Sequence, residues 1–100
     1  MSAAYLLDRA LTAASARAGV PITITSSRAE AWHSATFSGS RHRVEACGTS
    51  GERLDRWLAA LGDTDLTLPG HLLADASVGA VERAGGETRF TLTALTVAAD

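Results

Sequence analysis

The sequence predicts a two-layer α+β sandwich whose elements follow the order α-β-β-α-β-β. Apolar residues recur at helical spacing in two segments, strand-like alternation follows each segment, and glycine-containing turns divide both extended stretches into hairpins. This order favours one four-stranded, mainly antiparallel sheet with both helices on one face. The same order results when the first strand of a ferredoxin-like sandwich is moved to the end, a comparison of topology that implies no activity.

The chain has the size and composition of a single globular domain, residues 1–100. Its hydrophobic fraction is 46% and its charged fraction 20%, which suffices for a core without disulfides or metal ions. Residues 7–11 (LDRAL) resemble residues 54–58 (LDRWL), and each segment precedes extended chain. An internal duplication with halves 2–48 and 49–100 is therefore one interpretation, and chance similarity is the other.

The charge pattern argues against two classes of partner. The formal net charge is −2, whereas nucleic-acid binders and polybasic membrane-binding segments need clustered cations. All nine basic residues are arginine, and alanine is abundant, which fits a GC-rich bacterial gene. We expect neither a nucleic-acid partner nor a membrane partner.

The single cysteine and the N-terminus predict a cytoplasmic protein. Cys47 has no second cysteine for an intramolecular disulfide, which is typical of a reducing compartment. Asp8 and Arg9 interrupt the first apolar stretch, so the N-terminus does not resemble a signal peptide. No apolar run approaches the roughly 20 residues of a membrane-spanning helix.

The first unit is predicted as a helix over 2–18 and extended chain over 21–48. Ser2 is a suitable helix cap, and Gly19 a suitable residue to end the helix. The turn of the hairpin is predicted at 38–40, where Ser-Gly-Ser offers turn chemistry. The apolar stripe of the helix consists of Leu7, Leu11, Ala14 and Ala18.

The second unit is predicted as a helix over 50–61 and a hairpin over 71–99. Thr49 and Glu52 have capping-box spacing, and Gly62 is expected to end the helix. The buried stripe of this helix is Leu54, Trp57, Leu58 and Leu61.

The second hairpin is expected to turn at Gly85–Gly86. Each strand would have about a dozen residues, more than the usual 3–10, so a bend or bulge is expected near Gly79 and near 94–95. One face of the outgoing strand is predicted to carry Leu72, Ala74, Ala76, Val78 and Ala80.

Large apolar residues are predicted on the sheet face that the helices leave uncovered. In simple alternation Leu95 and Val97 point away from Phe90, and Trp32 points away from Phe37. Exposed apolar patches of this kind mark an interface or a ligand site. We expect a homodimer formed through sheet faces or strand edges, with a bulge at Ala94 that returns these residues to the core as the alternative.

Residues Cys47 to Arg53 have the C-x5-R spacing of the phosphate-binding loops of cysteine phosphatases. A helix N-terminus after such a loop can bind an anion and favour a thiolate. However, Ala46 stands where those enzymes commonly have histidine, and Leu54 where serine or threonine is usual. A buried cysteine at the end of a strand, followed by an ordinary capped helix, is the preferred interpretation.

The remaining polar motifs predict no cofactor or metal site. Residues 40–43 (SRHR) form a small basic hairpin tip, whose Arg41 and Arg43 are candidates for contacting an anion or an acidic partner. His33 is a candidate for lining a pocket. The histidines lack metal-binding spacing, and the Asp-x-Asp pair at 63–65 is interpreted as loop chemistry.

The sequence favours a non-enzymatic binding or regulatory module that self-associates and needs no cofactor. The alternative is a small-molecule or catalytic site on the outer sheet face, with Trp32 as an apolar wall and His33 or Arg43 as a polar contact. Because adjacent residues of a strand face opposite ways, Trp32 and His33 share one pocket only if a bulge intervenes.

Overall fold

The computed structural model describes residues 1–99 and confirms the predicted order of elements. A short 3-10 helix, Leu61–Asp63, follows the second α-helix. The α-helices and strands are α1 (Ala3–Arg17), β1 (Ile22–His33), β2 (Ser38–Thr49), α2 (Glu52–Ala60), β3 (His71–Ala84) and β4 (Glu87–Ala98).

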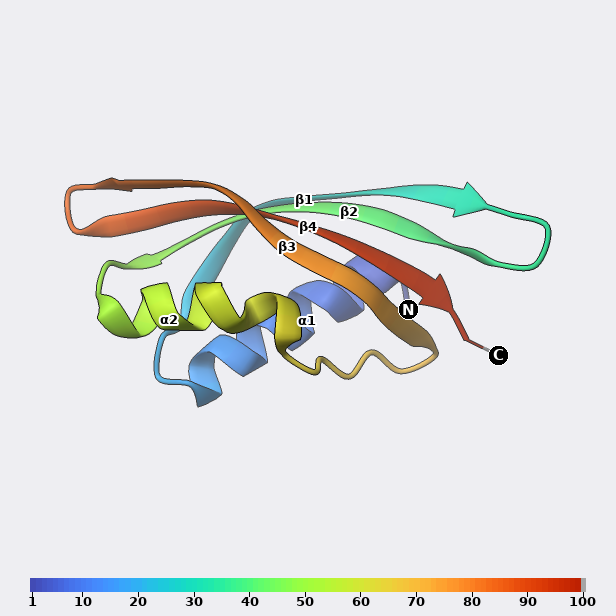
Figure 1. Ribbon diagram of the computed structural model, residues 1–100, viewed down its shortest axis with the longest axis horizontal. Coiled ribbons are helices and arrows are strands. Elements are labelled where there is room, and N and C mark those ends of the chain that lie inside the picture. Colours follow the sequence, from blue (N-terminus) through green and yellow to red (C-terminus); the bar gives the residue numbers. More distant parts are fainter. Residues whose placement is uncertain (100) are drawn as a thin grey trace.

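The four strands form one sheet in the order β1-β2-β4-β3, with every neighbouring pair antiparallel. Both helices lie on the same side of this sheet (Figure 1). The molecule measures 46 × 22 × 21 Å, and the β1–β2 and β3–β4 turns project at opposite ends. The fold is therefore α+β with a helical layer on one side of an antiparallel sheet, as predicted.

The core lies between the helices and the inner face of the sheet. Leu7 of α1 and Leu54 of α2 are fully buried against the central strands. Within residues 1–99, none of the helices is long and apolar enough to cross a membrane. The buried apolar cluster consists of Leu7, Leu11, Ile22, Val44, Ala46, Leu54, Leu58, Leu61, Leu68, Ala76, Phe90, Leu92 and Ala94.

Serine side chains hold both ends of α1. The Ser2 Oγ accepts a hydrogen bond from the Tyr5 amide at 3.2 Å, which confirms the predicted cap. Gly19 has a φ of 76°, a left-handed conformation that suits glycine, and ends the helix as predicted. The fully buried Ser15 accepts from the Ile22 amide at 3.2 Å and thereby ties the helix to the start of β1.

The turn of the first hairpin lies at 34–37, so the prediction at 38–40 is wrong. The Ser34 amide donates to the Phe37 carbonyl at 2.7 Å, and the Ser34 Oγ accepts from the Phe37 amide at 3.0 Å. Gly39 lies within β2, where a Cβ would overlap the Thr96 carbonyl oxygen of β4. The glycine at this position allows two strands to approach closely and is not a turn residue.

The predicted capping box is also wrong, because the residues before α2 belong to the sheet. Thr49 is the last residue of β2, and the N-cap position is Gly51, without a side-chain cap. The Ser50 amide donates to the Gly86 carbonyl at 2.9 Å, and its hydroxyl lies 2.7 Å from that of Thr88. Pairing with the second hairpin therefore replaces the local cap.

The α2 stripe is buried as predicted at its leucines, and Trp57 packs against it half-buried. Gly62 does not end α2 in a left-handed conformation as expected, since it lies inside the 3-10 helix that continues from α2. The turn at Gly85–Gly86 is confirmed, with both glycines at positive φ.

Two irregularities interrupt β3, and β4 remains regular. The register against β4 shifts between Leu73 and Asp75 and again between Val78 and Val81. The second shift confirms the bulge expected near Gly79. The first lies on β3, opposite the predicted position at 94–95 on β4.

Because of the first shift, the residues of β3 that precede it point to the sheet face opposite to the predicted one. Leu73 packs against the core together with Ala76, whereas Leu72 is 61% exposed. Leu72 and Ala76 therefore do not share a face. Along β4, buried and more exposed residues alternate without interruption, and Ala94 is one of the buried ones. The structure therefore does not have the bulge at Ala94 that would return Leu95 and Val97 to the core.

Candidate functional site on the outer sheet face

A row of apolar side chains crosses the outer face, which is the sheet face opposite the helices. Trp32 lies opposite Gly39, Gly39 opposite Val97, and Val97 opposite Leu72. Directly opposed residues point to the same face of a sheet. Because Gly39 has no side chain, the Trp32 indole approaches the glycine closely. The row thus reaches from one edge strand to the other at the end of the sheet near the β1–β2 turn.

Leu95 extends this row into an apolar patch, defined here as Trp32, Leu72, Leu95 and Val97. Leu72 is largely exposed, and the other three are half-buried. The structure therefore brings together three of the residues that alternation singled out and adds Leu72. Sequence reasoning missed Leu72 because the register shift after Leu73 leaves no clear signal in a strand rich in alanine.

His33 lies apart from this patch. It pairs with Ser38 at the end of β1 and is exposed on the face opposite to that of Trp32. No bulge separates the two residues, because the only register shift of β1 against β2 lies between Ile24 and Ser26. A shared pocket of Trp32 and His33 is therefore not formed.

Arg41 and Arg43 lie inside β2, so the predicted basic hairpin tip is wrong. Both side chains are exposed on the outer face. Arg41 lies in the same row as Leu95 of the patch, and Arg43 lies in the next row. Arg41 is opposite Glu30 of β1, and Arg43 is opposite Arg28. Charged side chains of both signs therefore border the patch.

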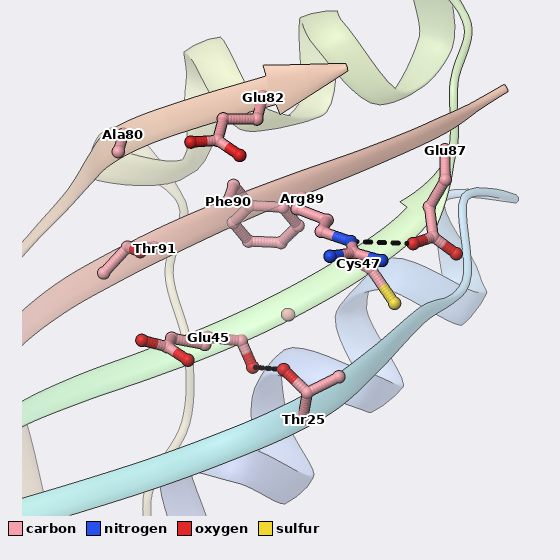
Figure 2. A pocket seen from close by; sticks show the side chains of 10 residues that line it. Thr25, Glu45, Cys47, Ala80, Glu82, Glu87, Arg89, Phe90 and Thr91 are labelled. Atoms are coloured by element: carbon pink, nitrogen blue, oxygen red, sulfur yellow. Dashed lines mark hydrogen bonds and ion pairs between the residues drawn. The ribbon is translucent and has the colours of Figure 1, made fainter. Parts of the chain in front are cut away.

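Cys47 and Arg53 do not share a pocket. Cys47 is half-buried in β2 and lines an open pocket of about 430 Å³ on the outer face, at the end remote from the apolar patch (Figure 2). Arg53 is exposed on α2 and lies along a separate groove beside Gly19. The C-x5-R segment is therefore divided between a strand and a helix, and its two functional groups are not brought to one anion.

The charged residues that line the pocket beside Cys47 are three glutamates and one arginine. Glu45, Glu82 and Glu87 contribute carboxylates, and the Arg89 Nε donates to Glu87 Oε1 at 3.1 Å (Figure 2). Since the arginine is already paired and carboxylates outnumber it, this pocket does not favour an anionic ligand. Sequence reasoning missed it because its residues come from all four strands.

His42 is buried on the inner face, where sequence reasoning had placed it in a turn. Only 3% of the residue is exposed, its Nε2 lies 2.8 Å from Thr96 Oγ1, and its Nδ1 has no hydrogen-bond partner among the described residues. Burial lowers the pKa of His42; the nearby Asp8 carboxylate opposes this effect, and His71 adds to it. Across residues 1–99, no cluster of three or more His, Cys, Asp or Glu is arranged to hold a metal ion.

Comparisons with known proteins give no relative from which a role could be transferred. No family model, curated protein or solved structure matches the chain.

Proposed function

We propose that the protein is a non-catalytic interaction module that associates with a second copy of itself through the apolar patch. The observation that carries this proposal is the row of Trp32, Val97 and Leu72 on the face that the helices leave uncovered. Water contact with such side chains is unfavourable, and a second apolar surface would remove it. The strand order β1-β2-β4-β3 supports a permuted ferredoxin-like topology for the module.

The size of the outer face suits a stable dimer. Four strands spaced ~4.8 Å apart, with about twelve residues at ~3.3 Å each, span roughly 750 Å². A typical specific interface buries about 800 Å² on each partner. A second copy can therefore cover this face to the extent that a stable complex requires.

The charges around the patch favour a second copy over a strongly charged partner. In the three rows of the outer face next to the row of Trp32, Val97 and Leu72, three basic and three acidic residues are present, so a partner of a single sign would meet as many like charges as opposite ones there. A copy of the same face offers both signs. These residues are Arg28, Arg41, Arg43, Glu30, Glu45 and Asp75.

Substitution of Leu72 by aspartate tests the patch. Leu72→Asp places a carboxylate in the apolar row, and we expect the dissociation constant of the self-complex to rise at least tenfold, because a buried unpaired charge is costly. Ala84→Asp is the matched control, since Ala84 is an exposed residue at the other end of β3. Light scattering gives the mass, and circular dichroism verifies folding. Equal masses for the two variants and the parent would contradict the proposal.

A small-molecule site is the second candidate, favoured by the pocket beside Cys47. Its three carboxylates and open form suit a small cationic ligand better than a phosphate ester. Hydrolysis of an aryl phosphate that Cys47→Ser abolishes would favour catalysis there over an interaction role.

A further inference from the structure

The free edge of β1 is unusually regular for an unprotected strand. From Ser26 to His33 the strand pairs with β2 without a register shift, and these residues include no proline. The β1–β2 hairpin projects beyond the helical layer, so the helices do not cover its outer half (Figure 1). The opposite edge, β3, carries two register shifts of the kind that keep free edges from pairing. The two edges of the sheet therefore differ in their capacity to accept another strand.

The turn geometry shows which backbone groups of β1 face outward. The Ser34 amide donates to the Phe37 carbonyl across the hairpin, so the backbone groups of Ser34 face β2. The direction of these groups alternates along a strand. Hence the N–H and C=O groups of Ser27, Ala29, Ala31 and His33 point away from β2, toward the free edge.

We propose that β1 of a second copy pairs with this edge in antiparallel register, with Ala29 on the two-fold axis. In this register Ala29 lies opposite Ala29 of the second copy, and Ser27 lies opposite its Ala31. Both positions have outward-facing backbone groups, so they form the hydrogen-bonded pairs of the new ladder. The two four-stranded sheets become one sheet of eight strands.

This register places Arg28 of each copy opposite Glu30 of the other. The two residues form a non-hydrogen-bonded pair, in which opposed side chains approach most closely. The two-fold axis produces the contact twice. The backbone hydrogen bonds and the charges thus favour the same pairing. If the second copy were shifted by two residues along the strand, Arg28 would no longer lie opposite Glu30.

The pairing also compensates an unfavourable contact within each copy. Arg28 lies opposite Arg43 of the neighbouring strand β2, and like charges in this position destabilise a sheet. Glu30 of the second copy adds a carboxylate on the other side of Arg28. Within one copy, β1 offers no carboxylate in the row that holds Arg28 and Arg43.

The edge contact goes beyond the outer-face contact and does not depend on it. Its two-fold axis runs perpendicular to the sheet, so the apolar patch of each copy stays uncovered. Leu72→Asp removes the outer-face contact without changing β1, so the edge contact can be measured by itself in that background.

A charge exchange on β1 tests the proposal. The variants Arg28→Glu, Glu30→Arg and the double exchange R28E/E30R are compared by sedimentation equilibrium, in the parent chain and in the Leu72→Asp background that removes the outer-face contact. Each single variant brings like charges together at both symmetric positions, and we expect a rise of roughly tenfold in the dissociation constant of the edge dimer. The double exchange restores opposite charges, and its dissociation constant should return to within about threefold of the starting value.

Thermal unfolding separates the edge contact from effects within one copy. Arg28→Glu removes the repulsion by Arg43 inside the chain, so it should not lower the monomer's unfolding midpoint even though it weakens the dimer. Three results would overturn the proposal. The single variants could associate as tightly as their starting chain, or the double exchange could associate as weakly as the single variants. The third such result is a Leu72→Asp chain that stays monomeric throughout the micromolar range. Because the outer-face contact is tested by Leu72→Asp in the unexchanged chain, failure of one contact is distinguishable from failure of the other.

Discussion

His42 is a buried polar side chain beside the apolar core, since its neighbours Val44 and Ala46 on the same face of β2 belong to that core. Among residues 1–99 its one hydrogen-bond partner is the Thr96 hydroxyl, and its buried Nδ1 has none. A neutral imidazole is tolerated in this position, whereas an imidazolium would need an acceptor for a second N–H. The burial of this residue therefore connects folding to pH.

Acid is expected to destabilise the fold through His42. Because the folded state lowers the pKa of this residue, the unfolded chain binds more protons between that value and the ordinary pKa near 6.5. The contribution of His42 to stability is complete above about pH 6.5 and is lost as the pH falls through this window toward the folded-state pKa. Thermal unfolding midpoints between pH 7.5 and pH 5.5 measure this loss.

The matched variants for this pH effect are His42→Gln and His33→Gln. His33 is an exposed histidine, so its removal should leave the pH dependence of the midpoint close to that of the parent. His42→Gln should flatten the dependence, whatever its cost at pH 7.5. A parent and a His42→Gln variant with the same slope would argue against the role of His42.

The β1–β2 hairpin shows what local sequence patterns can and cannot predict about an element. The strands and the double-glycine turn of the second hairpin follow from alternation and glycine content. The first turn was misplaced because Ser-Gly-Ser at 38–40 has turn chemistry, although Gly39 serves the approach of β2 to β4. Likewise Thr49 has the spacing of a cap but ends a strand. Both errors arise because contacts between distant segments override local preference.

Gly39→Ala tests this account of the hairpin. A methyl group there overlaps the Thr96 carbonyl, so the strands must separate, and we expect a loss of about 2–3 kcal/mol in the free energy of unfolding. For a domain of this size the midpoint should fall by roughly 10–20 °C.

Gly79→Ala is the control for Gly39→Ala. Its added methyl would lie 3.6 Å from the Thr91 carbonyl oxygen, an ordinary contact, and we expect a midpoint close to that of the parent. Equal midpoints for the two alanine variants in thermal denaturation would show that Gly39 has no special role.

At the scale of the whole molecule, the helices cover one face of the sheet only. The proposed contacts use the other face and the free edge of β1. Alternation along β1 and β4 sufficed to place Trp32, Leu95 and Val97 on the outer face. Placing Leu72, Arg41 and Arg43 required knowledge of how the strands are paired. That pairing register depends on the bulges in β3 and on the position of the first turn. The strand order also places β1 and β3 at the edges and β2 and β4 in the centre, an arrangement compatible with the suggested duplication, which stays a prediction.

Self-association of the unmodified chain is the central claim, and sedimentation equilibrium over the micromolar range tests it most directly. The chain has a mass of 10.3 kDa. We predict an average mass that rises with concentration to at least twice this value, because the outer face and the β1 edge each accept a second copy. A mass that stays at 10.3 kDa across the whole range would contradict the account.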